Sequence, residues 1–164
     1  MCLEIRRAAS DDAVAVSRIL ERAFSPYRRQ YTPAAYAATV LDPIAVRDRL
    51  QEGPVWVASR EGKIVGTVSA ILKKDEAHVR GMAVVPEAQG AGIGRALLQR
   101  VEAWAGRMGS ERLVLSTTPF LDRAIRMYQQ YGFRATTEGP FEMYGTPLHS
   151  MERSVNGLGA ADAC

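Results

Sequence analysis

Two periods of apolar and polar residues run along the chain, and they separate the expected strands from the expected helices. Residues 3–6 alternate between apolar and charged side chains, which is typical of a short strand. Ser10, Asp11 and Asp12 can cap a helix, and the apolar residues after them recur at the spacing of one helical face. This stripe consists of Val16, Ile19, Leu20, Ala23 and Phe24. We expect a first helix that Pro26 ends.

The next part of the chain predicts short helices and then a group of strands. Thr32-Pro33 and Asp42-Pro43 each place a capping residue before a proline, and proline is favoured in the first turn of a helix. Residues 55–59 and 63–72 are typical of strands, and the short segment between them suits a hairpin turn. Residues 77–85 are expected to form a further strand.

A strand, helix, strand unit follows in the middle of the chain. Apolar residues from Ile93 to Met108 keep a helical spacing, and Gly109 stands where a helix often ends in a left-handed residue. Residues 112–116 then resemble a buried strand. Because a helix connects them, the strands before and after it are expected to be parallel. The alternation of strands and helices predicts an α/β fold.

Glycines occupy every second position, at Gly90, Gly92 and Gly94, directly before this helix. Glycine permits a close approach of the backbone, and the amides at a helix N-terminus attract a phosphate. A tight turn that binds no ligand is the alternative. The spacing fits neither the dinucleotide fingerprint, whose third glycine would replace Arg95, nor a P-loop, because no Gly-Lys-Ser/Thr follows.

Composition limits the function further. The 164 residues suit one domain, with 47% hydrophobic and 24% charged residues and a net charge of +3. This surplus is too small and too evenly spread for a nucleic-acid surface, but it suits a small anionic ligand. No apolar run reaches the length of a membrane span, and Cys2 and Cys164 are too few for a disulfide scaffold. We expect a cytoplasmic protein with a domain at residues 1–155 and a flexible tail at 156–164.

Two segments resemble the acyl-CoA signatures of the GNAT N-acetyltransferase superfamily. The first runs from Gln89 to Gly94, after Met82-Ala83-Val84, and the second runs from Ala124 to Phe133. The resemblance extends over about residues 5–153. It implies a single-domain mixed β-sheet that is splayed between its fourth and fifth strands and flanked by helices. It also implies acetyl-CoA as co-substrate, with no metal.

The resemblance assigns cofactor-binding roles by position. The main-chain groups of Met82 and Val84 would hold pantetheine, and the amides from Gln89 to Arg95 would hold the pyrophosphate. The implied cofactor-binding residues are Met82, Ala83, Val84, Gln89, Gly90, Ala91, Gly92, Ile93, Gly94 and Arg95.

Two residues are the catalytic candidates. Tyr128 occupies the place of the family's usual acid for the CoA thiolate, although its helical face also fits core packing. His78 stands where many members carry a glutamate base, and histidine titrates near the working pH. An exposed strand residue is the alternative for His78, and Glu76 in a polar turn could relay a proton through water. Leu121 replaces an asparagine that is common in the family.

The acceptor site is expected in the least regular segments, at Tyr27, Arg28, Tyr31, Glu142 and Tyr144. Arg28 and Arg29 favour an acidic acceptor, and Glu142 favours a cationic one. The alternative is that the two arginines are a solvated charge pair and that Glu142 lies on the rim of a hairpin, without contact to an acceptor. The resemblance implies acetyl transfer to a primary amine of a small molecule or peptide, by direct attack in a ternary complex. A non-catalytic acyl-CoA sensor is the alternative. Neither nucleic acid nor membrane is an expected partner, and a homodimer stays open.

Overall fold

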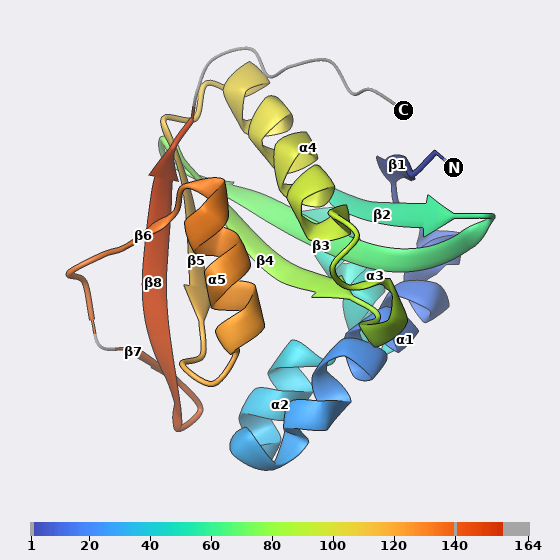
Figure 1. The fold of residues 1–164 in the computed structure, drawn as a ribbon, viewed down its shortest axis with the longest axis horizontal. Coiled ribbons are helices and arrows are strands. Elements are labelled where there is room, and N and C mark those ends of the chain that lie inside the picture. Colours follow the sequence, from blue (N-terminus) through green and yellow to red (C-terminus); the bar gives the residue numbers. More distant parts are fainter. Residues whose placement is uncertain (1, 140, 156–164) are drawn as a thin grey trace.

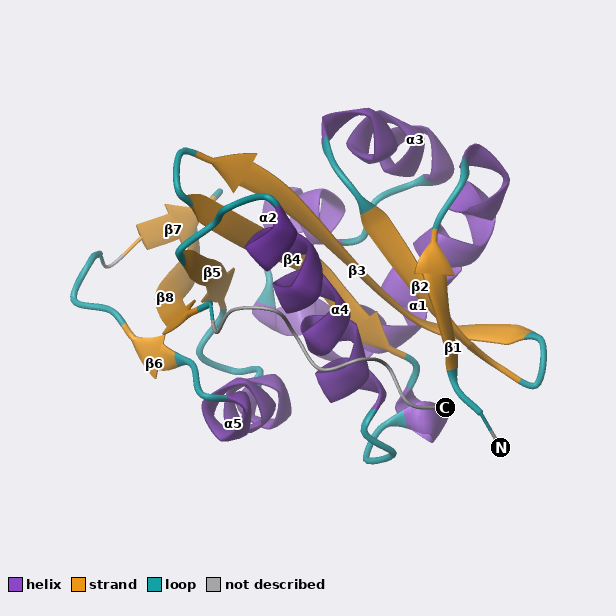
Figure 2. Ribbon diagram, turned by 90° about the horizontal axis from the view of Figure 1, so that it is seen from above, coloured by secondary structure: helices purple, strands orange, loops and turns teal. Residues whose placement is uncertain are grey.

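The computed structural model describes residues 2–139 and 141–155, in which one mixed sheet is covered by helices on both faces (Figures 1 and 2). The strand order is β1-β2-β3-β4-β5-β8-β6, with β7 paired to β8. All neighbouring pairs are antiparallel except β4 and β5, which are parallel. The strands are β1 Glu4–Arg7, β2 Val55–Arg60, β3 Lys63–Lys73, β4 Glu76–Val84, β5 Arg112–Thr117, β6 Arg134–Ala135, β7 Phe141–Met143 and β8 Thr146–Ser154. The predicted mixed α/β fold is confirmed.

The helices form two layers. Helices α4 and α5 cover one face of the sheet, and α1 and α3 cover the other (Figures 1 and 2). The helices are α1 Ala13–Phe24, α2 Pro33–Thr39, α3 Pro43–Glu52, α4 Ile93–Arg107 and α5 Asp122–Tyr131, with 3-10 turns at Ser10–Asp12, Ser25–Gln30 and Pro86–Ala88. Among the helices of the described residues, none has the length and apolar composition that a bilayer span requires. The cytoplasmic location stays a prediction.

Local sequence explains where these helices begin. The Thr32 hydroxyl accepts a hydrogen bond from the Ala35 amide at 3.2 Å, and the Asp42 carboxylate accepts one from the Ala45 amide at 2.8 Å. Both caps precede a proline at the first helical position, as the sequence predicts. Helix α1 ends at Phe24, two residues before Pro26, and Pro26 instead lies in the first turn of a 3-10 helix.

Strand β4 contains a β-bulge that changes which side chains share a face. Ser69 pairs with Arg80, but Thr67 pairs with Ala83, so β4 holds one extra residue at this point. Gly81 lies in the bulge with φ +65°, a conformation that favours glycine. His78 and Arg80 therefore share a face with Ala83. In a regular strand, His78 and Arg80 would instead share a face with Met82 and Val84.

The sheet opens between β4 and β5. The two strands pair only at Glu76–Arg112, Ala77–Leu113 and His78–Val114, and they separate beyond His78. Strand β5 remains paired with β8 over its whole length, so the opening exposes one edge of β4 to the space between the strands. This is the predicted splay between the fourth and fifth strands.

The C-terminal part differs in detail from the expectation. The final strand, Thr146–Ser154, pairs with a short β6 that the sequence analysis did not predict. A two-residue strand leaves no measurable periodicity in the sequence. The expected flexible tail at 156–164 lies outside the described residues, so the domain boundary at 155 stays a prediction.

Candidate active site

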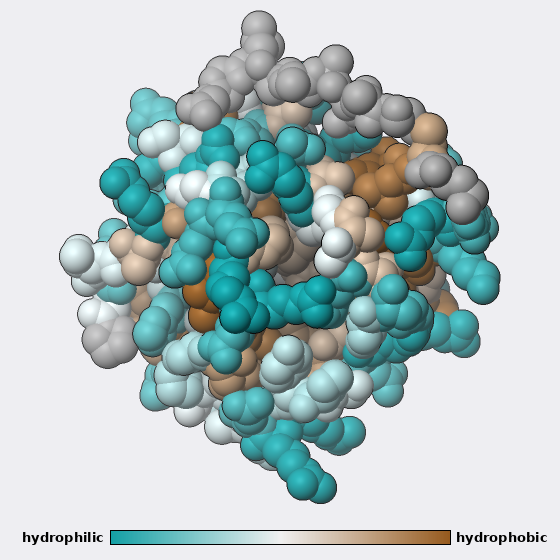
Figure 3. Space-filling view, in the orientation of Figure 1, coloured by the Kyte–Doolittle hydropathy of each residue, from teal (hydrophilic) through white to brown (hydrophobic). Residues whose placement is uncertain are grey.

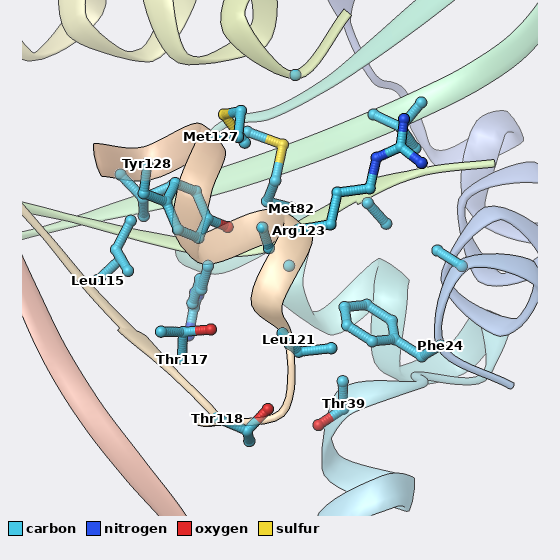
Figure 4. A pocket seen from close by; sticks show the side chains of 18 of the residues that line it. Phe24, Thr39, Met82, Leu115, Thr117, Thr118, Leu121, Arg123, Met127 and Tyr128 are labelled. Carbon is cyan, nitrogen blue, oxygen red and sulfur yellow. The ribbon is translucent and has the colours of Figure 1, made fainter. Parts of the chain in front are cut away.

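A cavity of about 930 Å³ lies where β4 and β5 separate. Its lining residues come from both sides of the splay, and Figure 4 shows part of them. Most of them lie on α1, α2, α3, α4 and α5, on β3, β4, β5, β7 and β8, in the 3-10 turn Ser25–Gln30, and in the segment from Gln89 to Gly94, which is called the glycine segment below. In the space-filling view, apolar surface lies beneath hydrophilic side chains near the centre of this face (Figure 3). The volume is in the range of small-molecule sites, roughly 300–1,000 Å³. The splay of the sheet therefore produces a ligand-sized cavity.

The lining carries cations and no acid. Its charged or titratable nitrogen side chains are Arg49, Lys73, His78, Arg80, Arg95, Arg123 and Arg126. Neither aspartate nor glutamate is among the described residues that line it. Such a cavity attracts anionic ligands, because the low-dielectric walls strengthen the field of the arginines.

The glycine segment lines the cavity, and a hydrogen bond ties its first residue back to the end of β4. The Gln89 side-chain amide donates a hydrogen bond to the Val84 carbonyl at 3.0 Å. Gly92 is the residue before the first turn of α4, with φ +81°, and no side chain caps that turn. A Cβ at Gly92 would meet no atom within 4 Å. The first amides of α4 therefore face open space, with the positive end of the helix dipole behind them.

Two arginines of α5 extend this cationic end. A Cβ on Gly90 would lie 3.1 Å from an Nη atom of Arg123, so the Arg123 guanidinium lies directly against the glycine segment. Arg126 also lines the cavity, as does the predicted Arg95, whereas Ala91 does not. The sequence analysis missed Arg123 and Arg126. Their spacing of three residues on one helical face is the signal that could have indicated them.

Gly94 serves packing between helices. A Cβ at this position would lie 3.2 Å from the Met127 methyl group of α5, so a larger residue would require the Met127 side chain to shift. Met127 lies beside Tyr128 in the cavity wall (Figure 4). The close approach of the two helices places the tyrosine near the glycine segment.

Tyr128 combines a packed ring with a free hydroxyl. The residue is only 7% exposed, and its ring makes an edge contact with Phe133 at 5.8 Å between centroids. Its hydroxyl points into the cavity and has no hydrogen-bond partner among the described residues (Figure 4). Burial raises the pKa of the Tyr128 phenol above its ordinary value, so the group keeps its proton at neutral pH.

His78 lies at the last β4–β5 pair before the splay and lines the cavity. Its Nε2 atom is 3.0 Å from the Glu76 carboxylate, which also binds Arg112. Glu76 is the first residue of β4, so its expected place in a polar turn is wrong: strand pairing with Lys73 extends over it. The carboxylate orients the imidazole, as in other carboxylate–histidine pairs.

The five predicted acceptor residues divide into two groups. Tyr27 and Tyr31 line the cavity. Arg28 does not line it, and its guanidinium lies 5.0 Å from the centre of the Tyr36 ring. Glu142 and Tyr144 are exposed and lie outside the lining, with Tyr144 70% exposed in the turn after β7. Their contact with an acceptor stays a prediction that the geometry does not favour.

The comparisons with known proteins agree with this geometry. A sequence profile described as "Acetyltransferase (GNAT) family" matches residues 14–133. Human N-acetyltransferase 8B is 33% identical over 104 residues, and the IAA acetyltransferase of Azospirillum brasilense is 36% identical over 91 residues. These alignments cover 58% and 54% of this chain but only 46% and 58% of the two relatives, so the chain spans about half the length of the curated relatives that it matches.

A solved structure shows the same fold. The PaiA N-acetyltransferase of Thermoplasma acidophilum in complex with coenzyme A has a TM-score of 0.80, at 15% identity over 94% of this chain and 99% of that one. The profile match, residues 14–133, spans both signature segments. The chain therefore belongs to the GNAT acetyltransferase family.

Proposed function

We propose that this protein transfers an acetyl group from acetyl-CoA to a primary amine of a small molecule or peptide, by direct attack in a ternary complex. The observation that carries the proposal is the cavity in the splay, which joins three features. They are an anion-binding helix terminus, an unpaired edge of β4 and a free tyrosine hydroxyl. Family membership and the coenzyme A bound in the Thermoplasma structure support the choice of co-substrate.

The residues around the cavity fit a CoA thioester. The amides from Gln89 to Arg95 would bind the pyrophosphate, and Arg95 and Arg123 would add charge-assisted hydrogen bonds. The main-chain groups of Met82 and Val84 would hold the pantetheine arm, because the edge of β4 that faces β5 has no strand partner in this stretch. Pantetheine carries amides that can bond to such an edge as an added strand does.

The chemistry needs one proton removed and one supplied. When bound, acetyl-CoA supplies an activated acetyl thioester. The acceptor nitrogen forms a new bond to the acetyl carbon and the carbon–sulfur bond breaks, so a thiolate leaves. Tyr128 would donate its proton to that sulfur, since the buried phenol stays protonated at neutral pH. No cysteine lies among the described residues of the cavity lining, which favours direct attack over an acyl-enzyme.

His78 would take the proton that the amine loses. Its Nε2 faces Glu76, so a proton on Nε2 leaves Nδ1 as the free acceptor. In this arrangement Glu76 is a positioning residue that fixes the tautomer. Arg112 holds Glu76 in turn, and its second contact is with Glu152 at 3.4 Å. The proposed base is therefore oriented by three further side chains near the last β4–β5 pair, which are Glu76, Arg112 and Glu152.

A pH series tests this role. We expect His78→Gln to lower kcat/KM at pH 7 by about 100-fold, as general bases typically contribute 10²–10⁴. The loss should shrink toward pH 9, because an α-amino acceptor titrates near ~8 and then needs no base. Glu76→Gln should cause a smaller loss with the same pH trend. An equal loss at every pH, or full activity at pH 7, would assign His78 to structure instead.

The whole proposal is tested by CoA thiol release from acetyl-CoA across a panel of amines and peptide N-termini. We expect release well above plain hydrolysis, with a mass gain of one acetyl group on the amine. The protein incubated with acetyl-CoA alone should gain no acetyl group. Tight acetyl-CoA binding without release on any amine would contradict transfer and favour the sensor interpretation.

A further inference from the structure

A second group of cations lies at the end of the cavity away from the glycine segment. Arg49 reaches the cavity from α3, and an Nη atom of Arg49 lies 2.9 Å from where a Cβ on Gly81 would stand. The missing side chain in the β4 bulge therefore makes room for this guanidinium. Arg49 belongs to a site that the sequence does not indicate, because α3 and β4 are far apart along the chain.

Among the described residues, no carboxylate contacts Arg49 directly. Arg49 makes no hydrogen bond and no ion pair with any other described residue, whereas Arg80 beside it is paired with Glu52. Burial and the Arg80 cation lower the pKa of Arg49 to about 10, and the charge of Glu52 offsets only part of this. The guanidinium is thus still charged at neutral pH. A half-buried cation without a partner is costly, and an anionic ligand would remove that cost.

The other permanently charged side chains that line this end are also cations. Lys73 and Arg80 belong to the same face of β3 and β4, since the register places Lys73 opposite Glu76 and Ser69 opposite Arg80. Both line the cavity, whereas the nearby carboxylates Glu52 and Glu76 do not line it and are already paired. An acceptor with several positive charges would therefore be repelled from this end.

We propose that the acceptor is an amine that also carries a carboxylate, and that Arg49, with Arg80, binds this carboxylate while the amine lies toward His78. The inference rests on the proposed function and specifies its substrate. Two residues of a strand span about 7 Å, so His78 and Arg80 are separated by a distance that one small amino acid, together with the long arginine side chains, can bridge. Arginine suits this role because its planar group binds carboxylates through two hydrogen bonds.

Matched acceptors test the proposal. Thiol release is measured for free amino acids, their carboxamides, their decarboxylated amines and peptides with an acidic first residue. We expect the carboxylate-bearing amines to exceed their carboxamides by about tenfold or more in kcat/KM, which is the lower end for a buried charge pair. Comparing free amino acids with acidic peptides shows whether the carboxylate belongs to a free amino acid or to the first side chain of a peptide.

Variants of α3 locate the binding group. Arg49→Met should raise KM for carboxylate-bearing acceptors by about tenfold or more, with little change for carboxamides and in the acetyl-CoA Kd. Arg49→Lys should restore part of the loss, because it returns the charge without the planar fork. Arg47→Met is the matched control, since Arg47 is exposed on the same helix. Thermal unfolding of each variant monitors the fold.

The outcomes separate the two proposals. Equal or better use of carboxamides and decarboxylated amines by the wild-type protein would overturn the carboxylate inference and leave the transferase function intact. An equal KM rise for all acceptors in Arg49→Met would also overturn it. Absence of acetyl-CoA binding would instead refute the proposed function itself. If acetyl-CoA binds but none of these amines is acetylated, both proposals fall.

Discussion

Replacing Gly92 with aspartate is expected to weaken acetyl-CoA binding by at least an order of magnitude while the fold persists. The new carboxylate would stand before the first turn of α4, where the unpaired amides face the proposed pyrophosphate. Like charges at short range repel, and a tenfold loss corresponds to about 1.4 kcal/mol. No atom lies within 4 Å of the added Cβ, so the folded protein has room for the side chain.

The matched control is Gly92→Asn. Gly92 has φ +81°, and asparagine and aspartate both adopt this left-handed region more readily than other residues. The two variants therefore share size and backbone strain and differ in charge. Calorimetric titration with acetyl-CoA should give a clearly larger Kd for aspartate than for asparagine. Equal affinities in two folded variants would refute the placement of the pyrophosphate.

Tyr128→Phe is expected to lower kcat by about 100-fold with little change in acetyl-CoA affinity. The substitution keeps the ring that packs against Phe133 and removes only the hydroxyl. Because this hydroxyl has no partner among the described residues, its loss should cost little stability. The expected size is the lower end of general acid catalysis, about 10²–10⁴.

Tyr131→Phe provides the control on the same helix. The Tyr131 hydroxyl is buried and donates a hydrogen bond to the Glu102 carboxylate at 2.6 Å, and Tyr131 does not line the cavity. Removing it should lower the free energy of unfolding, by about 1.5–3 kcal/mol for a bond to a charged group, and leave kcat nearly unchanged. Full activity of Tyr128→Phe would show that Tyr128 is only a packing residue.

Local sequence signals predicted most of the fold. The capping residues Thr32 and Asp42, each followed by proline, mark the starts of α2 and α3 because their effect depends on the next few residues alone. The glycine segment and the stripe after it predicted α4 and its parallel neighbours for the same reason. The choice of family came from the two signature segments together, and the profile match to residues 14–133 confirms it.

The site depended more on contacts between distant segments. The bulge at Gly81, the approach of Arg49 to it and the approach of Arg123 to Gly90 join segments that are far apart in the sequence. No periodicity within one element encodes such pairs. The sequence analysis named Arg28 as an acceptor candidate because Arg28 stands in an irregular aromatic segment, but the Arg28 guanidinium lies over the Tyr36 ring. The catalytic and binding roles of the candidate residues are predictions, and the variants described above test them.

The most direct test is a crystal structure of the wild-type protein with acetyl-CoA. We predict the pyrophosphate at the amides before and within the first turn of α4, and pantetheine along Met82 and Val84. The thioester sulfur should be in hydrogen-bond contact with the Tyr128 hydroxyl, and the acetyl group should face His78. Acetyl-CoA bound outside the splay, or a thioester separated from Tyr128 by other side chains, would contradict the account.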